Sequence, residues 1–176
     1  MEKIFIEKLG KVIKYKKDIE KLLKVTLKTT SEGVEIESKS DDAYSEFIAK
    51  SVVEALNSGF SLESALKLRN EDYMMQTISV KSHARPQRIK TIIGRLIGEK
   101  GRTKEIIAEM TGCDIAIHDY NVSVIGDTED VELAAHAIRS LIQGSPHASV
   151  YAYLERNRKF RKYKTEDLGL KEIKKK

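Results

Sequence analysis

The fold is decided by one stretch of the chain, Ile93-Gly94-Arg95-Leu96-Ile97-Gly98-Glu99-Lys100-Gly101-Arg102-Thr103-Lys104-Glu105-Ile106-Ile107. Gly98 and Gly101 bracket two charged residues, and apolar residues at helical spacing lie on both sides of this loop. Glycine is favoured where a backbone turns sharply or closely approaches a ligand. The stretch therefore predicts two helices joined by a Gly-x-x-Gly loop.

The start of the second helix carries basic side chains, Arg102 and Lys104. A helix start already has unpaired N–H groups and a partial positive charge, so these cations favour an anion such as phosphate. The loop lacks both the Gly-x-x-x-x-Gly-Lys-Ser/Thr pattern after a strand and the Gly-x-Gly-x-x-Gly pattern of nucleotide-binding sites. The alternative is a plain helical turn with solvated charges.

The composition indicates a soluble globular protein without a metal or cofactor. Hydrophobic residues make up 40% of the 176 residues, and no apolar run is long enough to span a membrane. Cys113 is the only cysteine, which excludes an internal disulfide and favours an intracellular location. The four histidines show no paired metal spacing.

Charge is segregated along the chain although the net charge is only +5. Residues 8–28 carry eight basic and two acidic groups, residues 81–104 carry eight and one, and residues 155–176 carry ten and four. The segments between them, 29–80 and 105–154, are acidic. Such clustering of basic groups around the loop indicates a nucleic-acid-binding protein.

The first half of the chain reads as a second copy of the arrangement. When residues 9–23 are laid under 93–107, the apolar positions coincide, whereas Lys14 and Lys17 fall on the two loop glycines. The first copy has therefore lost its Gly-x-x-Gly loop. We expect it to pack against the second copy or to hold a protein partner, while charge contacts to RNA through its lysines stay open.

Strands and further helices repeat in the same order in both copies. The strand-like segments are 3–9, 25–30 and 34–38, then 74–82, 114–118 and 122–125. Acidic helix starts follow at Asp41-Asp42 and at residues 127–130, where we expect N-cap side chains. Each copy ends in a glycine and one more helix, and Pro146 is expected at the first position of the last helix.

Helix, Gly-x-x-Gly, helix, Gly112 and two short strands resemble the KH domain, whose loop clamps the backbone of about four nucleotides. The resemblance implies an α+β fold with two tandem type I KH-like domains (β-α-α-β-β-α), each a three-stranded antiparallel sheet packed by helices, plus a basic C-terminal helix. The expected division is 1–72 for a degenerate KH-like domain, 73–164 for the KH domain with its loop and C-terminal helix, and 165–176 for a basic, disordered tail.

Single-stranded RNA needs a backbone clamp and a groove for its bases. Gly98 and Gly101 would admit the phosphate backbone, and the loop's middle residues, Glu99 and Lys100, should point to solvent. The cations expected to neutralise phosphates or widen the basic face are Lys100, Arg102 and Lys104, then Arg85, Arg88, Lys90 and Arg95. The candidates for the groove lining, each of which could equally be core, are Gly94, Ile97, Ile115 and Ile117. We also expect the pair Gly98→Asp and Gly101→Asp to leave the fold intact and to weaken RNA binding.

The segments 141–147 and 150–155, together with the two copies, resemble the KH-domain small-subunit ribosome assembly factors of archaea and eukaryotes, which include the partner of the Nob endonuclease. The resemblance implies binding to the 3′ end of the small-subunit rRNA precursor and cytoplasmic action in an archaeon. It also implies association with the Nob-type endonuclease, with the pre-small ribosomal subunit and with the α subunit of initiation factor two.

Two other functions compete with this RNA-binding, non-catalytic interpretation. A KH subunit of an RNA-degrading exosome would usually bring an additional RNA-binding barrel, for which no strand-rich segment is present. A nuclease could use Asp41-Asp42 or the acids at 127–130 as metal ligands, but helix capping already explains these residues. No catalytic pair of side chains stands out at a useful spacing.

Overall fold

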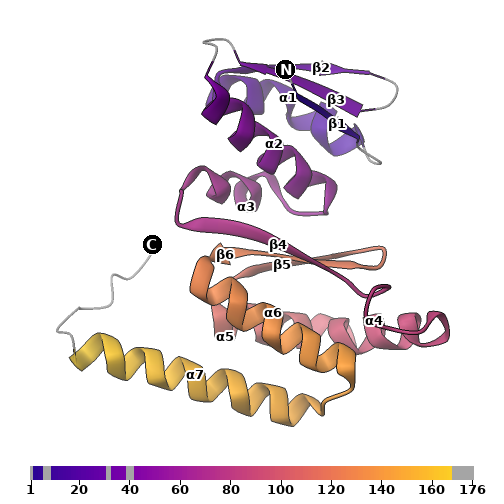
Figure 1. Ribbon diagram of the computed structural model, residues 1–176, viewed down its shortest axis with the longest axis vertical. Helices are drawn as coiled ribbons and strands as arrows, with labels where there is room; N and C mark the ends of the chain where they lie inside the picture. The colour runs from indigo at the N-terminus through magenta and orange to yellow at the C-terminus, as the bar shows by residue number, and fades with distance from the viewer. Residues whose placement is uncertain (1, 6–8, 31–32, 39–41, 168–176) are drawn as a thin grey trace.

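Two three-stranded antiparallel sheets, each packed by helices, make up the protein (Figure 1). The computed structural model describes residues 2–5, 9–30, 33–38 and 42–167. The strand order is β1-β3-β2 in the first sheet and β4-β6-β5 in the second, so the last strand of each half lies in the middle. The architecture is α+β, as predicted.

The first half is built around β1 (Glu2–Phe5), β2 (Val25–Thr29) and β3 (Gly33–Ser38). Its helices are α1 (Leu9–Leu23), α2 (Ala43–Asn57), α3 (Leu62–Leu66) and the 3-10 turn η1 (Lys67–Arg69). The predicted strand 3–9 is wrong at its end, because Leu9 already begins α1, and residues 6–8 lie outside the described residues.

The first half departs from the predicted β-α-α-β-β-α order at α1, which is one continuous helix instead of two helices and a loop. Lys14 and Lys17 stand in the middle of α1, where the aligned positions of the second half are glycines. Lysine is a good helix former and glycine is a poor one, so the helix continues where the second half turns. The loss of the two glycines thus removes the loop itself.

The second half has the predicted order of elements. It consists of β4 (Tyr73–Ser79), η2 (Pro86–Arg88), α4 (Ile89–Ile97), η3 (Glu99–Gly101), α5 (Arg102–Thr111), β5 (Asp114–His118), β6 (Asn121–Asp127), α6 (Thr128–Gln143) and α7 (His147–Asp167). β6 is longer than predicted because all seven residues of β4 pair with it, from Tyr73 opposite Asp127 to Ser79 opposite Asn121. The helix α7 begins one residue after Pro146, whose carbonyl oxygen accepts hydrogen bonds from Ser149 N and Val150 N. It also extends into the segment predicted as a tail, and residues 168–176 lie outside the described residues.

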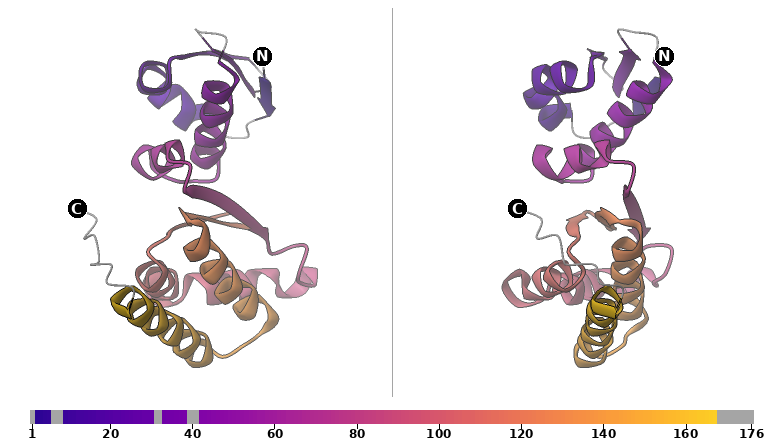
Figure 2. Two further views of the ribbon diagram at one scale, coloured as in Figure 1. Left: turned by 60° about the vertical axis from the view of Figure 1, so that its left-hand side comes forward. Right: turned by 90° about the vertical axis from the view of Figure 1, so that its left-hand side faces the viewer.

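The two faces of the second sheet have different partners. Ile115, Val122 and Val124 pack with α4, α5, α6 and α7 in one buried cluster. Ala116 and Ile125 point to the opposite face and are buried with the core of the first half. This alternation follows from the two-residue period of a strand. Figure 2 shows the second sheet between the first half and the helices of the second half.

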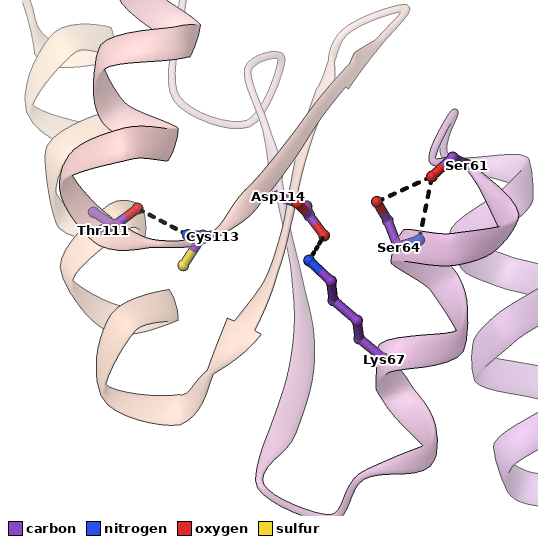
Figure 3. A network of polar contacts seen from close by, with 6 residues as sticks. All are labelled: Ser61, Ser64, Lys67, Thr111, Cys113 and Asp114. Carbon is purple, nitrogen blue, oxygen red and sulfur yellow. Dashed lines mark hydrogen bonds and ion pairs between the residues drawn. The ribbon is translucent and has the colours of Figure 1, made fainter. Parts of the chain in front are cut away.

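The first half packs on the second, as expected, through α3 and η1. Lys67 Nζ lies 2.6 Å from Asp114 Oδ2 at the start of β5 (Figure 3). Both side chains are partly exposed, so this ion pair contributes little compared with the burial of Ala116 and Ile125. The apolar contact, with Ala65 and Leu68 of the first half, therefore holds the two sheets together.

Candidate nucleic-acid interface

The Gly-x-x-Gly loop between α4 and α5 has the conformation that its glycines predict. Gly98 has φ 76° and ψ 175°, Lys100 has φ 53°, and Gly101 has φ 83°. Three residues with positive φ within four positions reverse the chain within one 3-10 turn, so that α5 begins at Arg102. Glu99 and Lys100 are exposed, as expected for the middle of the loop.

Gly98 is required because the backbone of the next helix lies against it. A Cβ at Gly98 would lie 2.7 Å from Thr103 N and would also collide with the Thr103 hydroxyl. At Gly101 a Cβ would meet nothing closer than Glu105 Oε1 at 4.0 Å, so only its positive φ favours glycine. The expectation that Gly98→Asp leaves the fold intact is therefore wrong, because Thr103 would have to move.

Three cations surround the loop, and none of them has a partner for an ion pair among the described residues. Lys100 and Arg102 are exposed, and Lys104 is half-buried. Arg102 and Lys104 lie in the first turn of α5, where free N–H groups add to the positive potential. The site is thus suited to an anionic backbone.

The remaining basic side chains divide into two groups. Arg85, Arg88 and Lys90 are exposed and lie around η2, at the opposite end of α4 from the loop. The nine residues of α4 place this group about 13 Å from the loop. A strand of a few nucleotides that follows α4 can therefore meet both groups.

Arg95, which the sequence placed on the basic face, has acceptors within the fold, although it also lines the hollow beside Gly98 and Arg102. Its guanidinium donates to Leu141 O at 3.2 Å and to Ser145 O at 2.7 Å, at the end of α6. The last carbonyls of a helix lack intrahelical donors, so this half-buried side chain serves the fold.

We predict that Arg95→Met lowers the free energy of unfolding by about 1–3 kcal/mol, because it removes hydrogen bonds to a charged donor. The salt dependence of RNA binding should stay unchanged. Arg88→Met is the matched control, since Arg88 is exposed and should affect the salt dependence but not stability. Thermal unfolding measures the change in stability, and filter binding at several salt concentrations measures the salt dependence of RNA binding. A reduced salt slope for Arg95→Met would return this residue to the RNA-binding face.

The four candidates for the groove lining are separated by the structure. Ile115 and Ile117 line a hollow with Lys104 and Ala108 of α5, and its other wall comes from the first half through Gly59, Phe60, Ser61 and Ser64. Gly94 lines a different hollow, with Thr91, Gly98, Arg102 and Tyr151. Ile97 is 38% exposed beside the loop. The sequence did not predict the wall from the first half, because it arises only when the halves pack.

The described part of the chain shows no metal site beside the interface. Within the described residues, no group of three or more His, Cys, Asp or Glu side chains could hold a metal ion. Asp42 accepts a hydrogen bond from Tyr44 N, and Asp127 accepts one from Glu129 N, so both acids cap helices as expected. Asp41 lies outside the described residues. In the same described part, no helix is long and apolar enough to cross a membrane.

A helix–Gly-x-x-Gly–helix unit packed on a three-stranded antiparallel sheet defines a KH-type RNA-binding domain. Residues 74–159 match the family model of the second KH domain of PNO1, which is described as a eukaryotic type KH domain (KH-domain type I). The chain belongs to the PNO1/Dim2 family of KH-domain proteins of pre-rRNA processing. The prediction of a non-catalytic RNA-binding protein is confirmed by this membership.

Similar proteins occur in archaea and eukaryotes. A KH domain-containing protein of Methanocaldococcus jannaschii is 32% identical over 154 residues, which cover 85% of this chain and 68% of that protein. The pre-rRNA-processing protein pno1 of Schizosaccharomyces pombe is 30% identical over 138 residues, 76% of this chain and 57% of that protein. A solved a/eIF2alpha–aDim2p–rRNA complex from Pyrococcus horikoshii holds a chain that is 36% identical, with a TM-score of 0.83 over 90% of this chain and 93% of that one. The chain thus spans little more than half of the yeast protein.

Proposed function

We propose that this protein binds single-stranded RNA near the 3′ end of the small-subunit rRNA precursor through its second half, as an assembly factor in the cytoplasm of an archaeon. The observation that carries the proposal is the loop with three cations that form no ion pair within the described part of the chain, on the KH domain of a family of pre-rRNA processing. Backbone phosphates fit this site because the glycines allow close approach and the cations supply countercharge.

The proposed RNA contacts come from the loop and from the basic group at the start of α4. The loop contributes Gly98, Glu99, Lys100, Gly101, Arg102 and Lys104, while Gly94 and Ile97 lie beside it and Arg85, Arg88 and Lys90 extend it. The division into units 1–72 and 73–164 belongs to the same proposal. It is supported by the strand order, which places the third strand in the middle of both sheets.

Two other functions would use the same site. One is a general KH subunit of an RNA-degrading complex of the exosome kind. The other is an RNA-linked partner of translation initiation, which is favoured by the Pyrococcus complex that contains a/eIF2alpha together with rRNA. An assembly factor should prefer the sequence of the rRNA 3′ end over other RNAs, and this preference distinguishes it from both alternatives.

We expect tight binding to a short single-stranded RNA that matches the 3′ end of the organism's own small-subunit rRNA, and at least tenfold weaker binding to a scrambled RNA of equal length. The affinity should fall steeply with salt, because each phosphate contact releases a counterion. Fluorescence anisotropy with both RNAs measures these quantities. Equal affinity for the two RNAs would favour a general RNA-binding function.

We infer a separate surface for a protein partner where the first half meets the start of β4. Tyr44, Phe47 and Met74 are 49%, 61% and 36% exposed, and they line one apolar groove between α2 and the start of β4. The charged side chains of its lining are the carboxylates Glu54 and Glu71, which repel RNA phosphates. We assign this groove to a protein with apolar and basic side chains, and the Nob-type endonuclease and the α subunit of initiation factor two are the candidates.

The variant Phe47→Ser should weaken binding of at least one of these two purified partners at least tenfold and leave RNA binding unchanged, because it removes an exposed aromatic anchor. Ile13→Ser is the matched control, since Ile13 is also exposed, at 54%, and lies outside the groove. Surface plasmon resonance with each partner gives the affinities. Unchanged affinity for both partners would remove the groove from the proposal.

A further inference from the structure

Two side chains of the last helix, α7, contact the helices on either side of the Gly-x-x-Gly loop. His147 and Tyr151 are four residues apart, so they lie on one face of the helix. Their rings lie 6.0 Å apart, centroid to centroid, and both side chains line the hollow beside Gly98. Figure 1 shows α7 alongside the helices of the second half, well away from the first sheet.

The first contact of α7 holds the helix that enters the loop. His147 Nε2 lies 3.0 Å from Arg95 O in the last turn of α4, and because a carbonyl oxygen only accepts, this nitrogen is the donor. Gly98 N already donates to Gly94 O, so the imidazole satisfies the next carbonyl of the helix end. The guanidinium of the same Arg95 holds Ser145 O, just before α7. Arg95 and the start of α7 are therefore joined by two hydrogen bonds, one donated by His147 and one donated by Arg95.

The second contact of α7 holds the helix that leaves the loop. The Tyr151 hydroxyl donates to Thr103 Oγ1 at 3.2 Å, in the first turn of α5. Thr103 is only 5% exposed, and it is the residue against which Gly98 packs. A shift of Thr103 would therefore change the turn at Gly98 directly.

We propose that α7 is a brace that fixes the opening of the Gly-x-x-Gly loop, with His147 and Tyr151 as positioning residues for the RNA backbone. This inference rests on the proposed function, since it assigns RNA to the loop. Neither contact involves a phosphate-binding cation. The brace acts because a loop that is already ordered loses less conformational entropy when RNA binds.

The experiment compares Tyr151→Phe and His147→Ala with Tyr153→Phe. Tyr153 lies on the same helix but contacts His136 of α6 in a tilted arrangement, with ring centroids 4.6 Å apart, so its variant makes the same chemical change away from the loop. Each brace variant should weaken RNA binding about three- to tenfold, the effect of one lost hydrogen bond. Tyr153→Phe should have no effect. His147→Gln, whose amide can donate to Arg95 O, should restore part of the affinity.

Two further readouts separate positioning from stability and from direct contact. Amide hydrogen exchange at residues 98–103 of the RNA-free protein should become faster in the brace variants only. The salt dependence of RNA binding should stay unchanged, because no phosphate contact is lost. Unchanged exchange in Tyr151→Phe and His147→Ala would overturn the brace even if RNA binds as proposed. Failure of the wild-type protein to bind RNA would overturn the proposed function, and the exchange measurement would still decide the brace.

Discussion

Lys100→Asp weakens binding to the rRNA 3′ end by roughly 10- to 100-fold, the equivalent of about 1.5–3 kcal/mol for a lost charge-assisted contact. Lys100 is exposed at the centre of the loop, and no acidic side chain of the described residues pairs with it. An aspartate there would repel the phosphate backbone, because both groups are negatively charged. The loop should keep its shape, because aspartate tolerates the left-handed backbone, φ 53°, that Lys100 adopts.

The chain offers a closely matched control for this substitution. Lys24, just after α1 in the first half, is also an exposed lysine with a left-handed backbone, φ 55°. Lys24→Asp therefore makes the same change of net charge and the same demand on the backbone, away from the loop. We expect its effect on RNA affinity to be less than twofold. Equal losses for the two variants, measured by anisotropy at one salt concentration, would mean that net charge and not the loop governs binding.

The sequence predicted the parts of the site that depend on local physics. Gly98 and Gly101 predicted a turn, and the apolar spacing on both sides predicted the helices, because both signals act over a few residues. The strand Asp114–His118 was also predicted correctly. These features needed no knowledge of how distant segments pack.

The sequence did not predict contacts that depend on distant partners. Arg95 was assigned to the basic face, and its acceptors within the fold, Leu141 O and Ser145 O, lie more than 40 residues along the chain. The bonds of His147 and Tyr151 to the loop helices likewise span about 50 residues. The spacing of four between His147 and Tyr151 was a usable signal for a shared face, but nothing local indicated which helices that face would meet.

The continuous helix α1 is a different kind of error, since its cause was visible in the sequence. The replacement of glycines at Lys14 and Lys17 was noted, but the two-helix pattern of the second half was still carried over to the first. Helix propensity at these two positions already favoured an uninterrupted helix. Local propensity was here a better guide than the repeat.

Gly98→Ala has the largest expected effect on stability among the loop variants, about 2–5 kcal/mol of unfolding free energy, from a strained backbone plus overpacking. Its φ of 76° and ψ of 175° lie in a region that is essentially restricted to glycine. A methyl group would also lie 2.7 Å from Thr103 N, which is backbone and cannot rotate away. The turn must therefore open, and RNA affinity should be lost together with stability.

Gly101→Asn is the control variant. It shows whether the loss of unfolding free energy in Gly98→Ala comes from the close approach of Thr103 or simply from replacing a glycine of the loop. Gly101 has φ 83° and ψ 3°, a left-handed conformation that asparagine also adopts, and open space surrounds the position of its Cβ. We expect Gly101→Asn to lose about 1 kcal/mol or less. Thermal unfolding should then show a fall in Tm of at least about 4 °C for Gly98→Ala and a smaller one for Gly101→Asn. Equal falls in Tm for the two variants would mean that the loop tolerates a shift of Thr103. In that case the hydrogen bond from Tyr151 to Thr103 could not hold the loop in one shape.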